Sequence, residues 1–195
     1  KRIHKIKRKQ IEEKKVIGNA ETKYREVYKA INNVFADNHK IRALFLFGFY
    51  GRRKTETLHL KWNDIDLIND SYTIRGANSK INTDMSFKLP PDVKSALLQC
   101  EHFSSYIFAS DRDPSKPISE IREHVDKIRA VTVPEYNFHW MRNLSVSALS
   151  SMGVEAIHLS AMLGHTDTAT VKQYLSLQRE SSSVHTLDAS KRLLG

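Results

Sequence analysis

The segment formed by residues 41–49 limits most strongly how this chain can fold. Its side chains are apolar on nearly every side when they are placed at helical spacing. A helix of this kind has to be covered by other elements, so we expect it to be buried. The 195 residues suffice for one domain with a substantial core, or for one domain and a tail. The longest apolar stretch, residues 43–50, is too short to span a membrane, and we expect no membrane partner.

Around this segment the hydrophobic pattern changes from helical to extended and back. Apolar residues recur at helical spacing between Tyr24 and Val34, which predicts an amphipathic helix that ends near residues 37–38. Short runs bounded by Asn, Asp, Gly and Ser predict strands at residues 65–67, 72–74 and 85–89, and a further one at 106–108. More helices are expected near residues 57–60, 91–98, 119–131, 139–152, 154–163 and 168–178. The predicted fold class is therefore mainly α (α+β), a helical domain with a small three-stranded antiparallel sheet.

Positive charge is concentrated at the N-terminal end. The net charge is +9, and residues 1–15 alone contain eight basic and two acidic residues. Such a run either binds phosphates without sequence preference or forms a solvated linker, and charge alone does not separate the two interpretations. The candidate contacts with a phosphate backbone in this run are Lys1, Arg2, Lys5, Lys7, Arg8 and Lys9. Because the sequence starts at Lys1 rather than Met, we expect residues 1–18 to be a linker from an upstream region.

The residues that could carry chemistry are mostly cationic. Phosphodiester transfer spreads negative charge over the phosphate oxygens, so its catalysis consists mainly of positioning and electrostatic stabilisation. Near the suspected site no carboxylate pair stands at the spacing of Mg²⁺ ligands, and the other histidines lack partners at ligand spacing, so we expect no metal and no cofactor. The single cysteine, Cys100, excludes an internal disulfide. The cations that could replace a metal are Arg53, Lys80, Arg142 and His165.

Spacing places several of these residues together. His139 and Arg142 are three residues apart and would share a face at the start of a helix. Glu56 follows Arg53 by three residues and could orient its guanidinium. His139 is also a candidate base, because it could exchange a proton while Arg142 binds the same phosphate.

Two further residues complete the candidate set. Tyr174 lies nine residues after His165, and a phenol with a pKa of about 10 can attack phosphorus when a base or cations assist it. Lys80 lies in a turn between two strands and could protonate a leaving oxygen, with Lys88 as the second choice. Taken singly, each of these residues is more often structural. The other tyrosines are expected in the core or at the surface; they are Tyr24, Tyr28, Tyr50, Tyr72, Tyr106 and Tyr136.

Taken in order, these motifs resemble the tyrosine recombinase (phage integrase) family. The matching motifs are Arg53-x-x-Glu56, the hairpin lysine Lys80, His139-x-x-Arg142, Leu163-Gly164-His165 and Tyr174. The resemblance covers roughly residues 20–178 and is most specific between residues 163 and 174. It implies a catalytic domain of the tyrosine-recombinase type at residues 19–178. Residues 179–195 would be a tail that either docks on a neighbouring subunit or packs on its own domain.

The resemblance also implies a role for each matching residue. Tyr174 would attack the scissile phosphate, which gives a 3′-phosphotyrosyl bond and a free 5′ hydroxyl. Lys80 would be the general acid and His139 the general base. The residues that would hold the non-bridging oxygens are Arg53, Arg142 and His165. Because the phosphotyrosyl bond conserves the bond energy, neither metal nor ATP would be needed.

The sequence departs from the family pattern in two places. Trp140 and Met141 stand inside His-x-x-Arg, where the family usually has an acidic residue and a leucine. Around the glycine before the first arginine the family often has a small hydroxyl residue and a leucine, whereas the run here is Tyr50-Gly51-Arg52-Arg53. We expect Arg52 to contact backbone phosphate, and neither departure removes a catalytic group.

The implied function is that of a phage or mobile-element integrase. It would act on double-stranded DNA as a homotetramer on two duplexes, in the cytoplasm at a bacterial nucleoid or in a phage-infected cell, with no small-molecule substrate. A type IB topoisomerase-like strand transferase is the first alternative, although that family typically has a lysine in place of His139. The second alternative is a DNA-binding module that kept the fold without catalysis.

Overall fold

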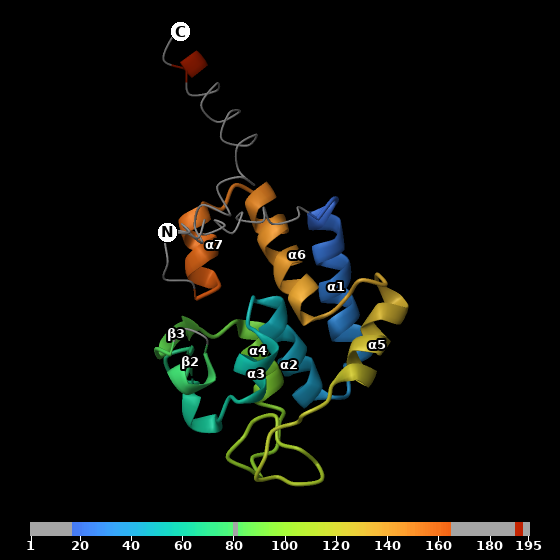
Figure 1. Cartoon of the computed structure of the whole chain (residues 1–195), viewed down its shortest axis with the longest axis vertical. Helices are drawn as coiled ribbons and strands as arrows, with labels where there is room; N and C mark the ends of the chain where they lie inside the picture. Colours follow the sequence, from blue (N-terminus) through green and yellow to red (C-terminus); the bar gives the residue numbers. More distant parts are fainter. Residues whose placement is uncertain (1–16, 80–81, 165–189, 193–195) are drawn as a thin grey trace, which may run out of the picture.

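The computed structural model describes residues 17–79, 82–164 and 190–192. Within these residues the helices pack against one another, and a small sheet lies to one side of them (Figure 1). The elements are α1 (Ala20–Val34), α2 (His39–Phe49), α3 (Lys54–Leu58), β1 (Ile65–Asp66), β2 (Ser71–Ile74), β3 (Met85–Lys88), α4 (Pro91–Leu97), α5 (Arg122–Val131), α6 (Phe138–Ser151) and α7 (Ala156–Met162). The expected helix at residues 168–178 lies outside the described residues, as do most of the N-terminal linker and most of the tail.

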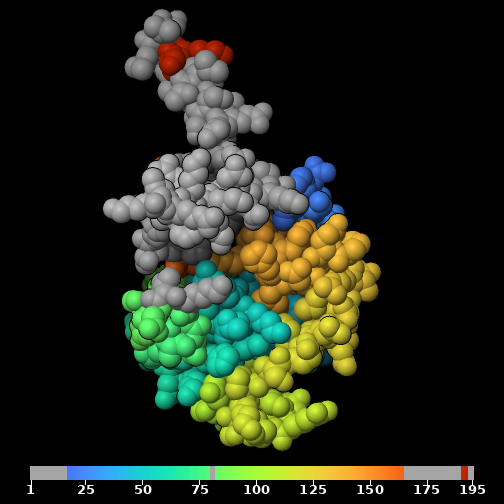
Figure 2. Space-filling model, in the orientation of Figure 1, coloured from blue at the N-terminus to red at the C-terminus, as the bar shows by residue number. Residues whose placement is uncertain are grey.

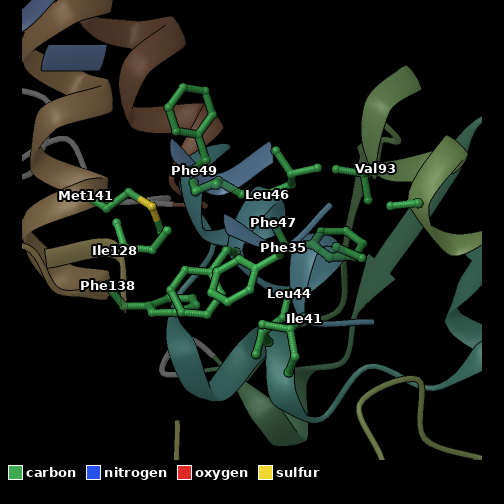
Figure 3. Packing of buried hydrophobic residues seen from close by; sticks show 14 of the residues in the cluster. Phe35, Ile41, Leu44, Leu46, Phe47, Phe49, Val93, Ile128, Phe138 and Met141 are labelled. Carbon is green, nitrogen blue, oxygen red and sulfur yellow. The ribbon is translucent and has the colours of Figure 1, made fainter. Parts of the chain in front are cut away.

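Helix α2 forms the centre of the core, as its apolar sequence predicts. It contacts α1, α3, α4 and α6. Phe45 and Phe47 are fully buried, and Figure 3 shows α2 residues packed together with Phe138 and Met141 from α6. Burying these large side chains contributes about 1.5–3 kcal/mol each relative to exposure, which is why the surrounding helices are held around α2.

The helix ends follow from local capping. The side chain of Asn38 accepts the backbone N–H of Ile41 at 3.0 Å and begins α2. Asn137 does the same for α6, where it accepts the N–H of Trp140 at 2.9 Å. Helix α6 therefore begins at Phe138, one residue before the predicted start, and its first turn carries His139.

The sheet is three-stranded and antiparallel, as predicted, and its strand order is β1-β2-β3. Tyr72 pairs with Phe87 and Ile74 with Met85, so these four side chains lie on one face. Tyr72 and Ile74 are buried in the core, whereas Met85 and Phe87 are half-buried. Met85 and Phe87 thus contact neighbouring segments: Phe87 lies under Arg52, and Met85 lies beside Gly164.

Other boundaries also differ from the sequence-based expectation, and helix α3 lies at Lys54–Leu58 instead of near 57–60. Residues 106–108 do not form a strand of the sheet, because Tyr106 makes only an isolated bridge with Lys61. Helix α5 begins at Arg122 rather than near 119, because the Glu120 carboxylate accepts the N–H groups of Ile121 and Arg122 at 2.8 Å. Helix α7 begins at Ala156, two residues later than predicted. In the part of the chain that the structure describes, no helix is both long enough and apolar enough to cross a membrane.

Candidate active site

Arg53 is oriented by Glu56, as the three-residue spacing predicts. Arg53 is the residue that precedes α3, and Glu56 lies in the first turn of that helix. One oxygen of the Glu56 carboxylate accepts the backbone N–H of Arg53 at 2.8 Å, and the other accepts Nη1 at 2.6 Å. The side chain of Glu56 is only 1% exposed, whereas that of Arg53 is 25% exposed. A buried carboxylate therefore holds an arginine whose guanidinium still reaches solvent.

Arg142 joins two segments that are distant in sequence. It lies in α6 and is only 4% exposed. Its guanidinium donates Nη1 to the carbonyl oxygen of Gly51 and Nη2 to that of Leu163, the latter at 2.9 Å. Gly51 lies two residues before Arg53, and Leu163 two residues before His165. Arg142 thus connects the segment that precedes Arg53 with the segment that precedes His165.

Arg53, His139 and Arg142 line one pocket of about 900 Å³. The pocket lies where the start of α3, α5 and the start of α6 meet, and Figure 2 shows the surfaces of these segments adjoining on one face. Three of the six predicted catalytic residues are therefore brought together from segments almost 90 residues apart. Lys80, His165 and Tyr174 lie outside the described residues, as do Lys1, Arg2, Lys5, Lys7, Arg8 and Lys9.

The loop between β2 and β3 is closed at its base by charged groups. Asp84 accepts the backbone N–H of Gly76 at 2.7 Å and Nη1 of Arg75 at 3.0 Å. Nε of Arg75 donates to Asp64 at 2.6 Å. The bond from Gly76 and then that from Arg75 hold the pKa of Asp84 below its ordinary value. We call this group of Asp64, Arg75, Gly76 and Asp84 the loop clasp.

Two glycines permit close approaches around this loop. A Cβ on Gly76 would lie 2.7 Å from the backbone of Asn82 and Thr83, so the two sides of the loop meet there. Gly164 has a φ of +67°, and a Cβ on it would lie 2.7 Å from Sδ of Met85. The residue before His165 therefore packs against β3, the strand that follows the loop of the predicted general acid.

Comparison with known proteins shows the family of the chain. The sequence profile of the phage integrase family matches residues 20–181. The chain belongs to the phage integrase family. A search of curated protein sequences gave no significant match.

Solved structures of recombinases and integrases share the fold. The XerA recombinase has a TM-score of 0.64 and 19% identity, with 82% of this chain and 62% of that chain covered. The XerH recombinase in a post-cleavage complex with a palindromic difH substrate has a TM-score of 0.66 and 17% identity, with coverages of 89% and 53%. The Tn1549 transposon integrase in complex with a circular-intermediate DNA has a TM-score of 0.59 and 13% identity, with coverages of 92% and 67%. The present chain thus spans about half to two thirds of the length of these proteins.

Arg52 departs from the phage integrase pattern and from our expectation. It is 1% exposed, and its guanidinium carbon lies 3.7 Å from the centre of the Phe87 ring. Burial lowers its pKa, while the nearby Tyr72 and Glu56 act in the opposite direction. We predicted that Arg52 contacts backbone phosphate. In the structure its buried guanidinium instead faces the ring of Phe87.

The other departure concerns the residues inside His-x-x-Arg. Met141 is fully buried in the core, and the hydroxyl of Tyr136 donates to its sulfur at 3.1 Å. Trp140 packs against Tyr136, with 6.2 Å between the ring centres. Neither Trp140 nor Met141 lines the pocket, so both act in packing.

Six tyrosines lie within the described residues, and none of them lines the pocket. The hydroxyls of Tyr28 and Tyr50 donate to one oxygen of Asp92 at 2.9 and 3.0 Å. Tyr72 and Tyr136 are buried, and burial raises the pKa of both. These phenols are structural, as the sequence led us to expect.

The pocket also contains charged residues that the sequence did not single out. Lys54, Arg122 and Arg129 line it together with the carboxylates of Glu120 and Asp126. Helix α5 supplies most of them, and its sequence carries no motif that points to a site. Within residues 17–79, 82–164 and 190–192, no three His, Cys, Asp or Glu side chains are grouped so that they could hold a metal ion.

Proposed function

We propose that this chain is the catalytic domain of a site-specific DNA recombinase or integrase that cuts and rejoins strands through a 3′-phosphotyrosyl intermediate. The observation that carries the proposal is the single pocket lined by Arg53, His139 and Arg142. Two arginines and a histidine around one pocket provide positive charge and a proton acceptor for a phosphodiester, and membership of the phage integrase family supports the same reaction. Neither metal nor ATP takes part in the proposed reaction.

In the first step, the phenol oxygen of Tyr174 attacks the scissile phosphorus while His139 accepts its proton. The bond between phosphorus and the 5′ oxygen breaks, and Lys80 protonates that oxygen. Arg53 and Arg142, together with His165, stabilise the charge on the non-bridging oxygens. The second step is the reverse: the 5′ hydroxyl of a partner strand attacks the phosphotyrosine, and the tyrosine is released.

The environments of the other tyrosines support Tyr174 as the nucleophile. Burial raises the pKa of Tyr24 to about 12, and it is the largest cause of the raised pKa of Tyr50. A phenol with a raised pKa is ionised less at neutral pH and is a weaker nucleophile under these conditions. By sequence position and by elimination, Tyr174 is the candidate.

The proposal extends to partners and domain organisation. We propose that the DNA is double-stranded. The XerH structure named above is a complex with a palindromic difH substrate, and the Tn1549 integrase structure is a complex with a circular-intermediate DNA. We propose a homotetramer on two duplexes at a bacterial nucleoid or in a phage-infected cell. Residues 1–18 would connect to a DNA-binding region, and residues 179–195 would dock on a neighbouring subunit.

A nicked duplex that traps the covalent intermediate tests the proposal. A library with a randomised central segment is mixed with the protein, and covalent adducts are separated on a denaturing gel. We expect the wild-type chain to form an adduct with a subset of sequences and Tyr174→Phe to form none. DNA binding without any adduct would indicate a non-catalytic module. Relaxation of supercoiled plasmid without a preferred site would indicate a topoisomerase instead.

A further inference from the structure

The pocket is much larger than one phosphate group requires. Its volume is about 900 Å³, so one phosphate group would fill only a part of it. Arg53, His139 and Arg142 account for one part of its lining, and the rest comes from Lys54 and α5. A DNA strand cannot present one phosphate without the next ones, so the remaining part of the pocket would face their charge.

Two cations in this part of the pocket have no close partner among the described residues. Lys54 is the first residue of α3, and Arg122 is the first residue of α5. Within the residues that the structure describes, neither side chain forms a hydrogen bond or a close ion pair, and the charges of both act on the carboxylate of Glu120. Arg129 is different, because it pairs with Asp126 at 2.7 Å and donates Nε to the Tyr136 carbonyl at 2.8 Å. Lys54 and Arg122 are therefore the cations available to a ligand.

The carboxylate of Glu120 offsets part of the positive charge of these two cations. Its carboxylate accepts the N–H groups of Ile121 and Arg122, which lowers its pKa, so it is ionised at neutral pH. The pocket is nevertheless positive, since five cationic side chains and two carboxylates line it. This excess of positive charge remains after Glu120 and Asp126 have each compensated one cation.

We propose that Lys54 and Arg122 form a second phosphate subsite, which binds a DNA backbone phosphate beside the scissile phosphate. The proposal rests on the function proposed above, in which Arg53 and Arg142 hold the scissile group. A contact of this kind carries no sequence information, but it fixes the position of the strand relative to the catalytic residues. It increases affinity and salt dependence without touching the reacting atoms.

Salt dependence of binding tests the subsite without requiring cleavage. The full chain is titrated onto a fluorescein-labelled duplex of 20 base pairs at several salt concentrations. Each lost phosphate contact lowers the slope of log affinity against log salt by about 0.9, so Lys54→Gln with Arg122→Gln is expected to lower it by about 2. Glu120→Gln keeps an acceptor for the helix N–H groups and is expected to tighten binding. The matched control is Lys29→Gln with Lys127→Gln, two exposed lysines outside the pocket.

Uncharged backbone positions locate the contact. In the duplex recovered by covalent capture, single phosphates on either side of the cleavage position are replaced by methylphosphonate. We expect one flanking replacement to weaken binding by the wild-type chain about tenfold and to have no further effect on the Lys54→Gln, Arg122→Gln variant.

Three results would overturn the subsite. The first is an unchanged salt slope for the variant Lys54→Gln, Arg122→Gln, provided that its melting temperature equals that of the wild type. The second is an equal decrease of the slope in the Lys29, Lys127 control. The third is independent, additive effects of the variant and of every methylphosphonate. Absence of an adduct with the wild-type chain would instead count against the proposed function, and the salt measurement would still decide whether Lys54 and Arg122 bind backbone phosphate.

Discussion

The side chains of Arg53 and Arg142, two of the proposed catalytic residues, are held by hydrogen bonds that involve the backbone. Arg142 donates to two carbonyl oxygens that lie 91 and 21 residues away in sequence. Glu56 contacts Arg53 at three residues' distance. The Arg53–Glu56 contact could be predicted from the sequence because it is local. The partners of Arg142 could not be, because their positions depend on how α6 packs against the end of α2 and on where α7 ends.

Replacing Glu56 by glutamine tests the orientation of Arg53. The amide cannot match both bonds of the carboxylate, so Arg53 would lose part of its fixed position. We expect adduct formation to slow by about tenfold to a hundredfold, because displacements near 1 Å have effects of that size. The free energy of unfolding is expected to fall by about 1–3 kcal/mol. Glu123→Gln, an exposed change on α5, is the control, and equal rates in both variants would contradict the role of Glu56.

At the scale of the elements, hydrogen bonds and ion pairs of Asp and Glu side chains fix the loop between β2 and β3 and the start of α5. The strands and the buried α2 were predictable from side-chain periodicity, because burial of one face dictates the pattern. Tyr106 was misassigned because an apolar run of three residues fits a strand equally well, while in the structure it forms only one bridge with Lys61. The loop clasp could not be predicted either, since nothing in the sequence pairs Asp84 with Arg75 and Gly76.

The loop clasp leads to a prediction about proton transfer. If the loop presents Lys80 to the leaving oxygen, Asp84→Ala should impair protonation and slow cleavage by about tenfold or more, within the usual range for general acid catalysis. A substrate with sulfur at the 5′ bridging position should restore the rate, because a thiolate is a weaker base and leaves without a proton. Equal losses on the oxygen and sulfur substrates would show that Asp84 does not act through a general acid.

A tyrosine cluster on Asp92 connects α1, α2 and α4. Burial, and then the charge of Asp92, raises the pKa of Tyr24 to about 12 from its ordinary value of about 10. Because the folded state favours the neutral phenol, this stabilisation is complete below pH 10 and is lost as the pH rises from about 10 to about 12. Asp92→Asn removes the charge, so the phenol titration followed at 295 nm should shift to lower pH. An unchanged titration would contradict the assigned role of Asp92.

For the whole molecule, the fold brings an excess of basic side chains from distant segments into one pocket. Helix α5 contributes Arg122, Asp126 and Arg129 to the pocket, about 70 residues after Arg53 and before His139 in the chain. The sequence predicted α5 as a helix but not as a wall of the site, because its charged residues have the spacing of an ordinary solvated face. The motif residues could be assigned to one site only through their joint order.

The basic N-terminal run gives a prediction at this scale. Residues 1–15 carry a net charge of +6, and their removal is expected to lower the salt slope of DNA binding by up to about 5. The folded domain should keep its free energy of unfolding within about 0.5 kcal/mol, since Ile17 and its bond to Ser147 remain. An unchanged slope would favour the interpretation of this run as a solvated linker.

The central claim is that Tyr174 becomes covalently attached to DNA at the site formed by Arg53, His139 and Arg142. The most direct test is to isolate the trapped adduct, digest protein and DNA, and identify the modified peptide by mass spectrometry. We predict a nucleotide attached through its 3′ phosphate to Tyr174, and loss of the adduct in Tyr174→Phe. Attachment to any of the six other tyrosines, or through a 5′ phosphate, would contradict the account.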